Sequence, residues 1–281
     1  MEPVGFTIGV VGLASLFSTC MECFDYIQLG RDFGNDYGKC LLRLDAAKLR
    51  FSRWGEATGI ASISQASERL TVSEKDFRLA ESLLQQIQDS FEDTEKISRR
   101  YQKHSTLNGP TTDALVVYDE QVDLSPQDLR LHSQLRAIAL RPQKSTGLVR
   151  KARWALYEKK KLDAMISDIT EFVDKLVDLF PNVKESQMPL CKDELSTIRD
   201  AQDLAKLKAI AGADDQVLQS CTDAELARRG HVVTQWEAKD NADVWVGDEN
   251  GVGVQSKGHR VSEFSVSGSA KVRLGNNNKG L

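Results

Sequence analysis

The spacing of hydrophobic residues changes near residue 229 and divides the chain into two parts of different character. Before that point, apolar residues recur mostly every three or four positions, which is the period of a helix that buries one face. After it, they recur at every second position, which is the period of a β-strand. We therefore expect an all-α helical bundle over residues 1–228 and a β-forming tail over residues 229–281.

The helical period is strongest over residues 145–180, where Pro181 is expected to end the helix because proline cannot continue one. A second helix is expected to begin at Ser73, with Asp76 in its first turn, and to run to Ile97. The other expectations for this part are helical segments over 26–54 and 190–211, a long loop over 106–125, and a polar, weakly helical junction over 213–228.

The start of the chain is unusual because residues 3–21 carry no charged side chain. These 19 residues fall within the roughly 17 to 25 that span a bilayer as a helix. Glycine, serine and threonine dilute their hydrophobicity, so we expect a helix that is packed inside the bundle at rest and can insert into a membrane if the bundle opens. The residues expected to define this latent membrane helix, with a small-xxx-small spacing of glycines, are Gly5, Gly9, Gly12, Leu13, Leu16 and Phe17.

The tail contains one 18-residue pattern twice, at an offset of 28 residues. Residues 231–248 read HVVTQWEAKDNADVWVGD, and residues 259–276 read HRVSEFSVSGSAKVRLGN. Five positions are identical, whereas a coincidence of about 6% per residue predicts roughly one. In each copy two alternating runs flank a pair of turn residues, so each copy is predicted to be a strand, a bend and a second strand.

The two copies are expected to stack on each other. The positions expected to form the core of that stack are Val233, Trp236, Ala238, Ala242, Val244, Val246 and Gly247 in the first copy, and Val261, Phe264, Val266, Ala270, Val272, Leu274 and Gly275 in the second. The polar and charged pairs expected to stack are Asp243 with Lys271, Thr234 with Ser262, and Asp248 with Asn276.

Two copies of a repeat leave two open strand edges, and a repeat stack needs about three or more units or caps. An open edge is a template for another chain. We therefore expect the tail to be disordered when soluble and to form a two-rung β-solenoid as amyloid, with further copies of this chain as its partners. The alternative is a disordered, glycine-rich tail with an accidental duplication.

Composition and charge narrow the classes of function. The net charge of −4 gives no sign of a polyanion-binding surface, so no nucleic-acid partner is expected. Five cysteines without framework spacing, and no basic segment before the first apolar stretch, indicate a cytoplasmic protein with free thiols. Cys20 and Cys23 form a C-x-x-C pair, but they lack a second pair and a nearby histidine, so both are expected to be buried thiols rather than metal ligands.

The sequence carries no motif for catalysis. It has no phosphate-binding G-x-x-x-x-G-K-[ST] loop and no G-x-S-x-G nucleophile motif, and its four histidines show no metal-ligand or general-base spacing. We therefore expect no catalytic, cofactor-binding or metal-binding residues, and a protein that is not an enzyme.

Several stretches resemble one known family. Residues 16–57 (LFSTCMECFDYIQLGRDFGNDYGKCLLRLDAAKLRFSRWGEA) and 153–181 (RWALYEKKKLDAMISDITEFVDKLVDLFP) resemble the HeLo domain of the fungal HET-s/HET-S heterokaryon-incompatibility proteins, within a likeness that covers most of residues 1–220. The segments ADVWVGD and AKVRLGN resemble the Ala/Ser-x-Val-x-Leu/Ile-Gly-Asn core of that family's prion-forming domain. The first copy departs from it with Asp248 in place of asparagine, and the connecting loop is shorter than the family's usual one.

The resemblance implies a role in fungal self/non-self recognition and programmed cell death. In the family's toxic form, the amyloid fold of the tail unlocks the helical domain, whose N-terminal helix then inserts into the cell membrane and forms a pore. The implied partners are further copies of this chain (including a dimer of the helical domain), proteins or a receptor with a similar prion motif, and the membrane. Family alleles differ between toxic and prion-only types through residues near Glu22 and Asp32. The prion-only type, and a helical scaffold whose tail binds a partner's sheet edge, stay open as alternatives.

Overall fold

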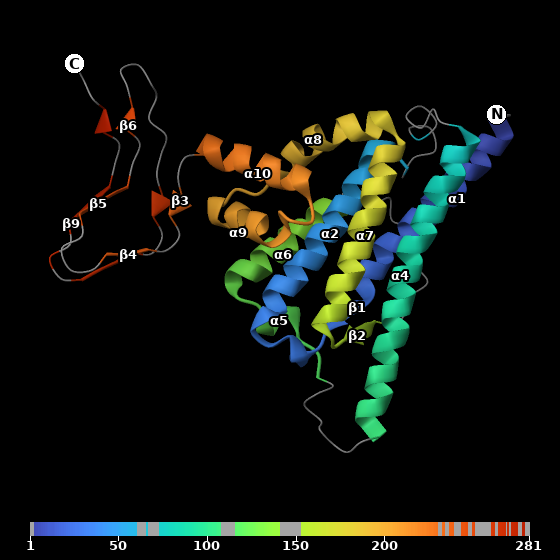
Figure 1. Cartoon of the computed structure of the whole chain (residues 1–281), viewed down its shortest axis with the longest axis horizontal. Helices are drawn as coiled ribbons and strands as arrows, with labels where there is room; N and C mark the ends of the chain where they lie inside the picture. Colours follow the sequence, from blue (N-terminus) through green and yellow to red (C-terminus); the bar gives the residue numbers. More distant parts are fainter. Residues whose placement is uncertain are drawn as a thin grey trace.

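The computed structural model describes residues 3–60, 66, 73–107, 116–140 and 153–229, and in the tail residues 232–233, 236–238, 243–246, 249–250, 260–261, 264–267, 269, 271–274 and 277–278. In this part of the chain an all-α bundle precedes a tail of short strands (Figure 1). This confirms the predicted helical bundle, and the amyloid state of the tail stays a prediction. The helices are α1 (Pro3–Tyr26), α2 (Tyr37–Thr58), α4 (Glu74–Leu107), α5 (Glu120–Asp123), α6 (Pro126–Ala139), α7 (Lys159–Leu179), α8 (Pro181–Ser196), α9 (Ala201–Ala211) and α10 (Gln216–Arg229). A 3-10 segment, η1 (Arg31–Asp36), precedes α2, and two short strands, β1 (Ile27–Leu29) and β2 (Trp154–Leu156), pair within the helical part.

α2 lies at the centre of the helical part and packs against α1, α6, α7, α8 and α9. Of its 22 residues, 17 are buried, so its polar side chains must find partners inside the protein. Aromatic rings fill one side of this core, where Phe17 of α1 lies 4.9 Å from Phe51 and 5.9 Å from Trp54, measured between ring centroids. Gly55 allows the contact, because a Cβ atom there would lie 2.2 Å from the Phe17 ring.

One face of α1 is packed into the bundle, whereas Val11 on this helix is exposed. Val10, Leu13 and Phe17 are buried, and the helix lies against α4 and α2. At Gly9, a Cβ atom would lie 2.9 Å from the Phe77 ring, so glycine lets α4 approach closely. Gly5 belongs to the first turns of α1, where the structure describes only the backbone. Within the described residues, no helix combines the length and apolar character that crossing a membrane takes.

Several helix ends follow local sequence signals. α6 is capped by Ser125, whose hydroxyl accepts a hydrogen bond from the backbone N–H of Asp128 (3.1 Å), and Pro126 is its first residue. α2 is followed by its C-cap Gly59, whose left-handed backbone (φ 66°) suits glycine. Pro181 ends α7 as predicted, and it also begins α8.

One predicted helix starts too early. The period over residues 145–180 predicts a single helix, but Trp154–Leu156 form β2, which pairs in parallel with β1, and α7 begins only at Lys159. The prediction fails because Trp154 and Leu156 alternate with Ala155 over three residues, a pattern that fits a strand as well as a helix. Residues 141–152 lie outside the described part of the chain.

Other boundaries also differ from the predictions. The segment 213–228, expected to be a weakly helical junction, contains most of α10, which packs because its Leu218 and Cys221 are buried in a core shared with α8 and α9. The segment 26–54 includes β1 and η1 before α2 begins. α6 was not predicted, although its capping signal is plain in the sequence.

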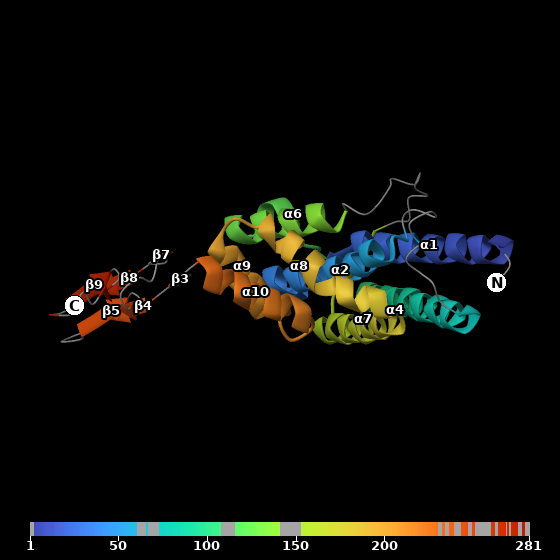
Figure 2. The same cartoon turned by 90° about the horizontal axis from the view of Figure 1, so that it is seen from above.

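The tail consists of short parallel pairs, each joining residues 28 positions apart. The pairs are β3 (Val232–Val233) with β7 (Arg260–Val261), β4 (Trp236–Ala238) with β8 (Phe264–Val266), β5 (Asp243–Val246) with β9 (Lys271–Leu274), and β6 (Glu249–Asn250) with β10 (Asn277–Asn278). Figure 2 shows the two copies stacked, next to the end of α10. The tail is thus joined directly to the last helix of the bundle.

Candidate functional site

Apolar positions of the two tail copies lie opposite one another. Parallel strands place equivalent residues side by side at each paired position, so the same face of both copies is apolar. The pairs among the expected core residues are Val233 with Val261, Trp236 with Phe264, Ala238 with Val266, Val244 with Val272, and Val246 with Leu274. Ala242, Gly247, Ala270 and Gly275 lie outside the described residues.

One pair of opposite charges lies on the outside of this stack. Asp243 lies opposite Lys271 in the register of β5 and β9, and both side chains are exposed. A directly opposed pair of unlike charges favours pairing, whereas like charges there oppose it. The other expected polar pairs, Thr234 with Ser262 and Asp248 with Asn276, lie outside the described residues.

The pairing continues two residues beyond each predicted repeat. In β6 and β10, Glu249 lies opposite Asn277 and Asn250 lies opposite Asn278, at the same offset of 28. The sequence signal was available, because Asn250 and Asn278 are identical residues at that offset. Stacked asparagine side chains add to the stability of in-register strands.

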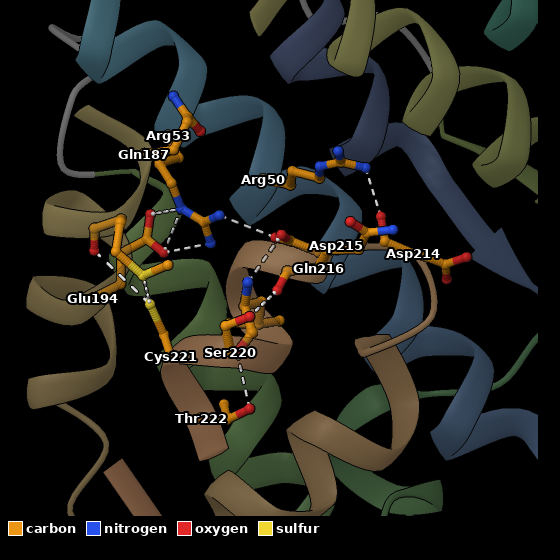
Figure 3. A network of polar contacts seen from close by, with 12 residues as sticks. Arg50, Arg53, Gln187, Glu194, Asp214, Asp215, Gln216, Ser220, Cys221 and Thr222 are labelled. Atoms are coloured by element: carbon orange, nitrogen blue, oxygen red, sulfur yellow. Dashed lines mark hydrogen bonds and ion pairs between the residues drawn. The ribbon is translucent and has the colours of Figure 1, made fainter. Parts of the chain in front are cut away.

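The N-terminal end of α10 is fixed to α2 by a buried ionic network (Figure 3). The Arg53 guanidinium donates to both carboxylate oxygens of Glu194 on α8 (2.7–3.0 Å) and to Asp215 (3.0 Å), and the three side chains are 1%, 6% and 5% exposed. Asp215 also accepts the backbone N–H of Leu218 (3.0 Å) and so caps α10. Burial alone would lower the pKa of Arg53, but the two carboxylates outweigh burial and raise it, so the guanidinium stays charged.

Two more arginines of α2 hold the turn before α10. Arg43 donates through Nε (2.5 Å) and Nη2 (3.1 Å) to the carboxylate of Asp214, and Arg50 donates to the backbone carbonyl of Asp214 (2.5 Å). Together with Arg53, three arginines of α2 thus donate hydrogen bonds to the adjacent residues Asp214 and Asp215. We call this set, Arg43, Arg50, Arg53, Asp214 and Asp215, the α10 clamp.

The other end of α10 is held by its last residue. Arg229 donates from Nη1 to the backbone carbonyls of Ile198 (2.8 Å) and Arg199 (2.9 Å), and from Nε to Glu225 (2.6 Å). β3 begins only three residues later, at Val232. Arg229 is thus the last described residue of the bundle before the first tail strand.

A second ionic network ties the end of α1 to the same central helix. Asp25 accepts from Lys48 of α2 (2.6 Å) and from Arg136 of α6 (2.5 Å), and Arg136 also donates to the buried Asp45 (2.9 Å). The Lys48 side chain is 2% exposed. Burial lowers the pKa of Lys48, and the attraction of Asp25 offsets this only in part. α2 thus connects the anchor of α1 to the clamp of α10.

His132 extends this second network. Its Nδ1 lies 2.6 Å from Asp45 and its Nε2 lies 3.2 Å from Glu120. Burial lowers the pKa of His132, but the two carboxylates outweigh it and raise the pKa from 6.5 to about 9. The protonated ring donates on both sides, and it joins α5 to α6 and α2.

The raised pKa of His132 predicts a pH-dependent stability. Because the folded state holds the proton more tightly than the unfolded chain, this contribution is complete below about pH 6.5 and is lost as the pH rises through about 9. We expect unfolding to cost about 3 kcal/mol less at pH 9 than at pH 6 through this residue. Urea denaturation of the wild type and of His132→Gln tests it: the difference between them should shrink with rising pH, and a pH-independent difference would contradict it.

Glu22 and Asp32 lie at opposite ends of the α1–η1 connection. Glu22 accepts a hydrogen bond from Tyr26 of the same helix (3.1 Å), and Asp32 in η1 accepts one from Tyr101 of α4 (3.1 Å). Neither belongs to the two buried networks. The family resemblance pointed to these two positions but not to Asp25, which anchors α1, because a single charge at a helix end does not reveal its partners.

The fold and these contacts define a class of protein: a helical bundle whose last helix leads into a tail of two repeats that pair strand by strand. A family model described as "HeLo: Prion-inhibition and propagation" matches residues 5–210. The chain belongs to this HeLo family, whose members are signalling and prion proteins and not enzymes.

Named relatives and solved structures agree with this assignment. The chain is 37% identical over 239 residues to "Heterokaryon incompatibility protein S" and to "Heterokaryon incompatibility protein s" of Podospora anserina, covering 85% of this chain and 79% of each relative. The structure of the HET-s N-terminal domain matches with a TM-score of 0.69 and 36% identity, over 77% of this chain and 97% of that domain. A double mutant of that domain matches with a TM-score of 0.67 and 35% identity, over 76% of this chain and 98% of the mutant. The resemblance noted in the sequence is thereby confirmed.

Proposed function

We propose that this protein is a fungal heterokaryon-incompatibility signalling protein in which amyloid templating of the C-terminal repeats controls a membrane-active helical domain. The observation that carries the proposal is the single register of the tail, in which equivalent residues of the two copies pair in parallel with Asp243 opposite Lys271. Kinship with the heterokaryon-incompatibility proteins of Podospora anserina supports it.

The tail is suited to template further chains. Each described strand pairs with one strand of the other copy, so the outer edge of each copy is open to another molecule. If the first copy of an incoming chain pairs with the second copy of the last one, Asp243 of one molecule meets Lys271 of the next. The charges then alternate along the whole stack, whereas a shift by one copy would oppose like charges. The partners are thus further copies of this chain, and related proteins or a receptor with a similar motif.

Signal transmission would pass through α10. Fixing the tail in a stack fixes the backbone from Val232 onward, close to the point where Arg229 holds the end of α10. A stacked geometry that is incompatible with the resting path of α10 would pull Arg229 from its carbonyl partners and then strain the α10 clamp. Because α2 also carries Lys48, the partner of Asp25, loss of the clamp favours release of α1.

The effector is α1, which we propose leaves the bundle and inserts into the cell membrane. Its buried face would be exposed by release, and residues 3–21 bring no charge into the lipid. The resting protein would then lie in the cytoplasm and relocate to the membrane on activation. A dimer of the helical domain is compatible with this scheme but is not required by it.

The proposal is tested by mixing the full-length chain with dye-loaded vesicles and sonicated fibres of the same protein. We expect fibres with one molecule per roughly 9.4 Å, twice the strand spacing of about 4.7 Å, and seed-dependent dye release that disappears when residues 1–22 are deleted. Fibres without dye release would identify the prion-only type. Absence of seeding would favour a scaffold whose tail binds a partner, and dye release by the deleted chain would refute the role of α1.

A further inference from the structure

We propose that the described helical domain contains a binding site for a small anion that carries phosphate or carboxylate groups, in a cavity at the junction of β1, β2 and α4. The cavity measures about 220 Å³. Its polar and aromatic lining residues are Gln28, Arg99, Gln102, Arg153, Trp154 and Tyr157. This site is independent of the proposed signalling function, because it lies apart from the paired tail strands and the α10 clamp.

Regular structure forms the walls of the cavity. Gln28 and Ala155 are the middle residues of β1 and β2, lie opposite each other in the parallel pair, are half-buried, and both line the cavity. Arg99 and Gln102 belong to α4, which is joined to β2 because the Ser98 hydroxyl donates to the backbone carbonyl of Ala155. The pairing of β1 with β2 and the Ser98 contact fix these elements before a ligand arrives, which lowers the entropy cost of binding.

The charged groups in the lining are both positive. Arg153 is exposed and makes no hydrogen bond or ion pair with any other described residue, and its charge acts on the Glu120 carboxylate only at longer range. Arg99 uses its Nε and Nη2 atoms on Glu95 (2.7 and 2.6 Å), which leaves further guanidinium hydrogens for a ligand. Burial raises the pKa of Tyr157, so its hydroxyl stays neutral and adds no negative charge.

The chemistry and the size of the cavity define the class of ligand. Two guanidiniums match the geometry of phosphate and carboxylate oxygens, and the Gln28 amide in the same lining can donate to the ligand as well. Pockets for drug-sized molecules measure about 300–1,000 Å³, so this smaller cavity fits a compact polyanion such as a diphosphate or a tricarboxylate. Because the overall protein is acidic (net charge −4), a general attraction for anions does not explain binding at this place.

The test measures binding of sodium pyrophosphate and of citrate to the full-length chain by isothermal titration calorimetry and thermal unfolding, at constant ionic strength. We expect saturable binding of at least one of them at a single site, with a rise in the unfolding midpoint. Comparing the two anions distinguishes a phosphate ligand from a carboxylate ligand. The wild-type chain, Arg153→Gln, Arg99→Gln and Arg100→Gln are compared under the same conditions.

Arg100→Gln is the matched control, because Arg100 follows Arg99 on α4 and is exposed but does not line the cavity. Loss of Arg153 is expected to weaken binding about tenfold or more, as for removal of a hydrogen bond to a charged group. Arg99→Gln should weaken it to a similar extent, whereas Arg100→Gln should bind as the wild type does. No binding at millimolar concentrations of either anion, or equal weakening by all three variants, would overturn the proposal. Arg153 is exposed and makes no hydrogen bond or ion pair with another described residue, so we expect its variant to fold.

Discussion

Replacing Arg53 with alanine is expected to lower the free energy of unfolding of the helical domain by about 3–5 kcal/mol. The change removes the cation from between Glu194 and Asp215, whose side chains are only 6% and 5% exposed. Both carboxylates would then remain buried without their charged partner, which costs far more than the loss of a surface ion pair. Urea denaturation of the full-length protein measures the change.

The effect should be concentrated at α10. Asp215 also caps that helix, so loss of Arg53 frees the Asp215 side chain from α2 and loosens the helix start. Backbone amides of α10 should exchange their hydrogens much faster in Arg53→Ala than in the wild type, whereas amides of α4 should change less. Exchange that speeds up equally in both helices would show that the network supports the whole bundle and not α10 in particular.

Arg228→Ala is the matched control for this experiment. Arg228 also pairs with a carboxylate, Glu225 of the same helix, but its side chain is 70% exposed. Exposed ion pairs contribute little, so we expect this variant to lose no more than about 0.5 kcal/mol. A loss in Arg53→Ala as small as the loss in Arg228→Ala would contradict a role for the buried network.

The sequence predicted those features that depend on local periodicity. The change of period near residue 229 predicted the boundary between bundle and tail, and the internal repeat predicted which residues could pair across the tail. α4 was found because Ser73 and Asp76 mark its start and its apolar positions repeat every three or four residues. Such signals depend on residues that are neighbours along the chain, so they can be recognised without knowledge of the tertiary structure.

The two ionic networks could not be predicted, because burial of a charged side chain depends on distant elements. Arg43, Lys48, Arg50 and Arg53 all lie on α2, and in sequence they read like the solvated face of an ordinary helix. Their partners come from α1, α7, α8 and the turn before α10, at sequence separations of 23 to 171 residues. One local signal of their burial was present. The residues between these four basic residues are mostly apolar, so α2 has no fully polar face.

Replacing Asp243 with lysine is expected to have a second large effect, on fibre growth, because of the register of the tail strands. In Asp243→Lys, two lysines would lie opposite each other in β5 and β9, and every further molecule in a stack would add another lysine to the same row. Each opposed like-charge pair weakens strand pairing, and the row contains no anion to relieve it. We expect the concentration needed for fibre growth from seeds of the same variant to rise about tenfold or more.

The decisive comparison is the exchanged pair, Asp243→Lys with Lys271→Asp. The double variant has the same composition as the wild type and restores alternating charges along the stack, so its fibres should grow at close to the wild-type concentration. The single variant should also recover in about 1 M salt, where charges are screened beyond about 3 Å. Failure of the exchanged pair to recover would mean that these positions matter for their shape or for another contact, and that charge alternation does not set the stacking of the two copies.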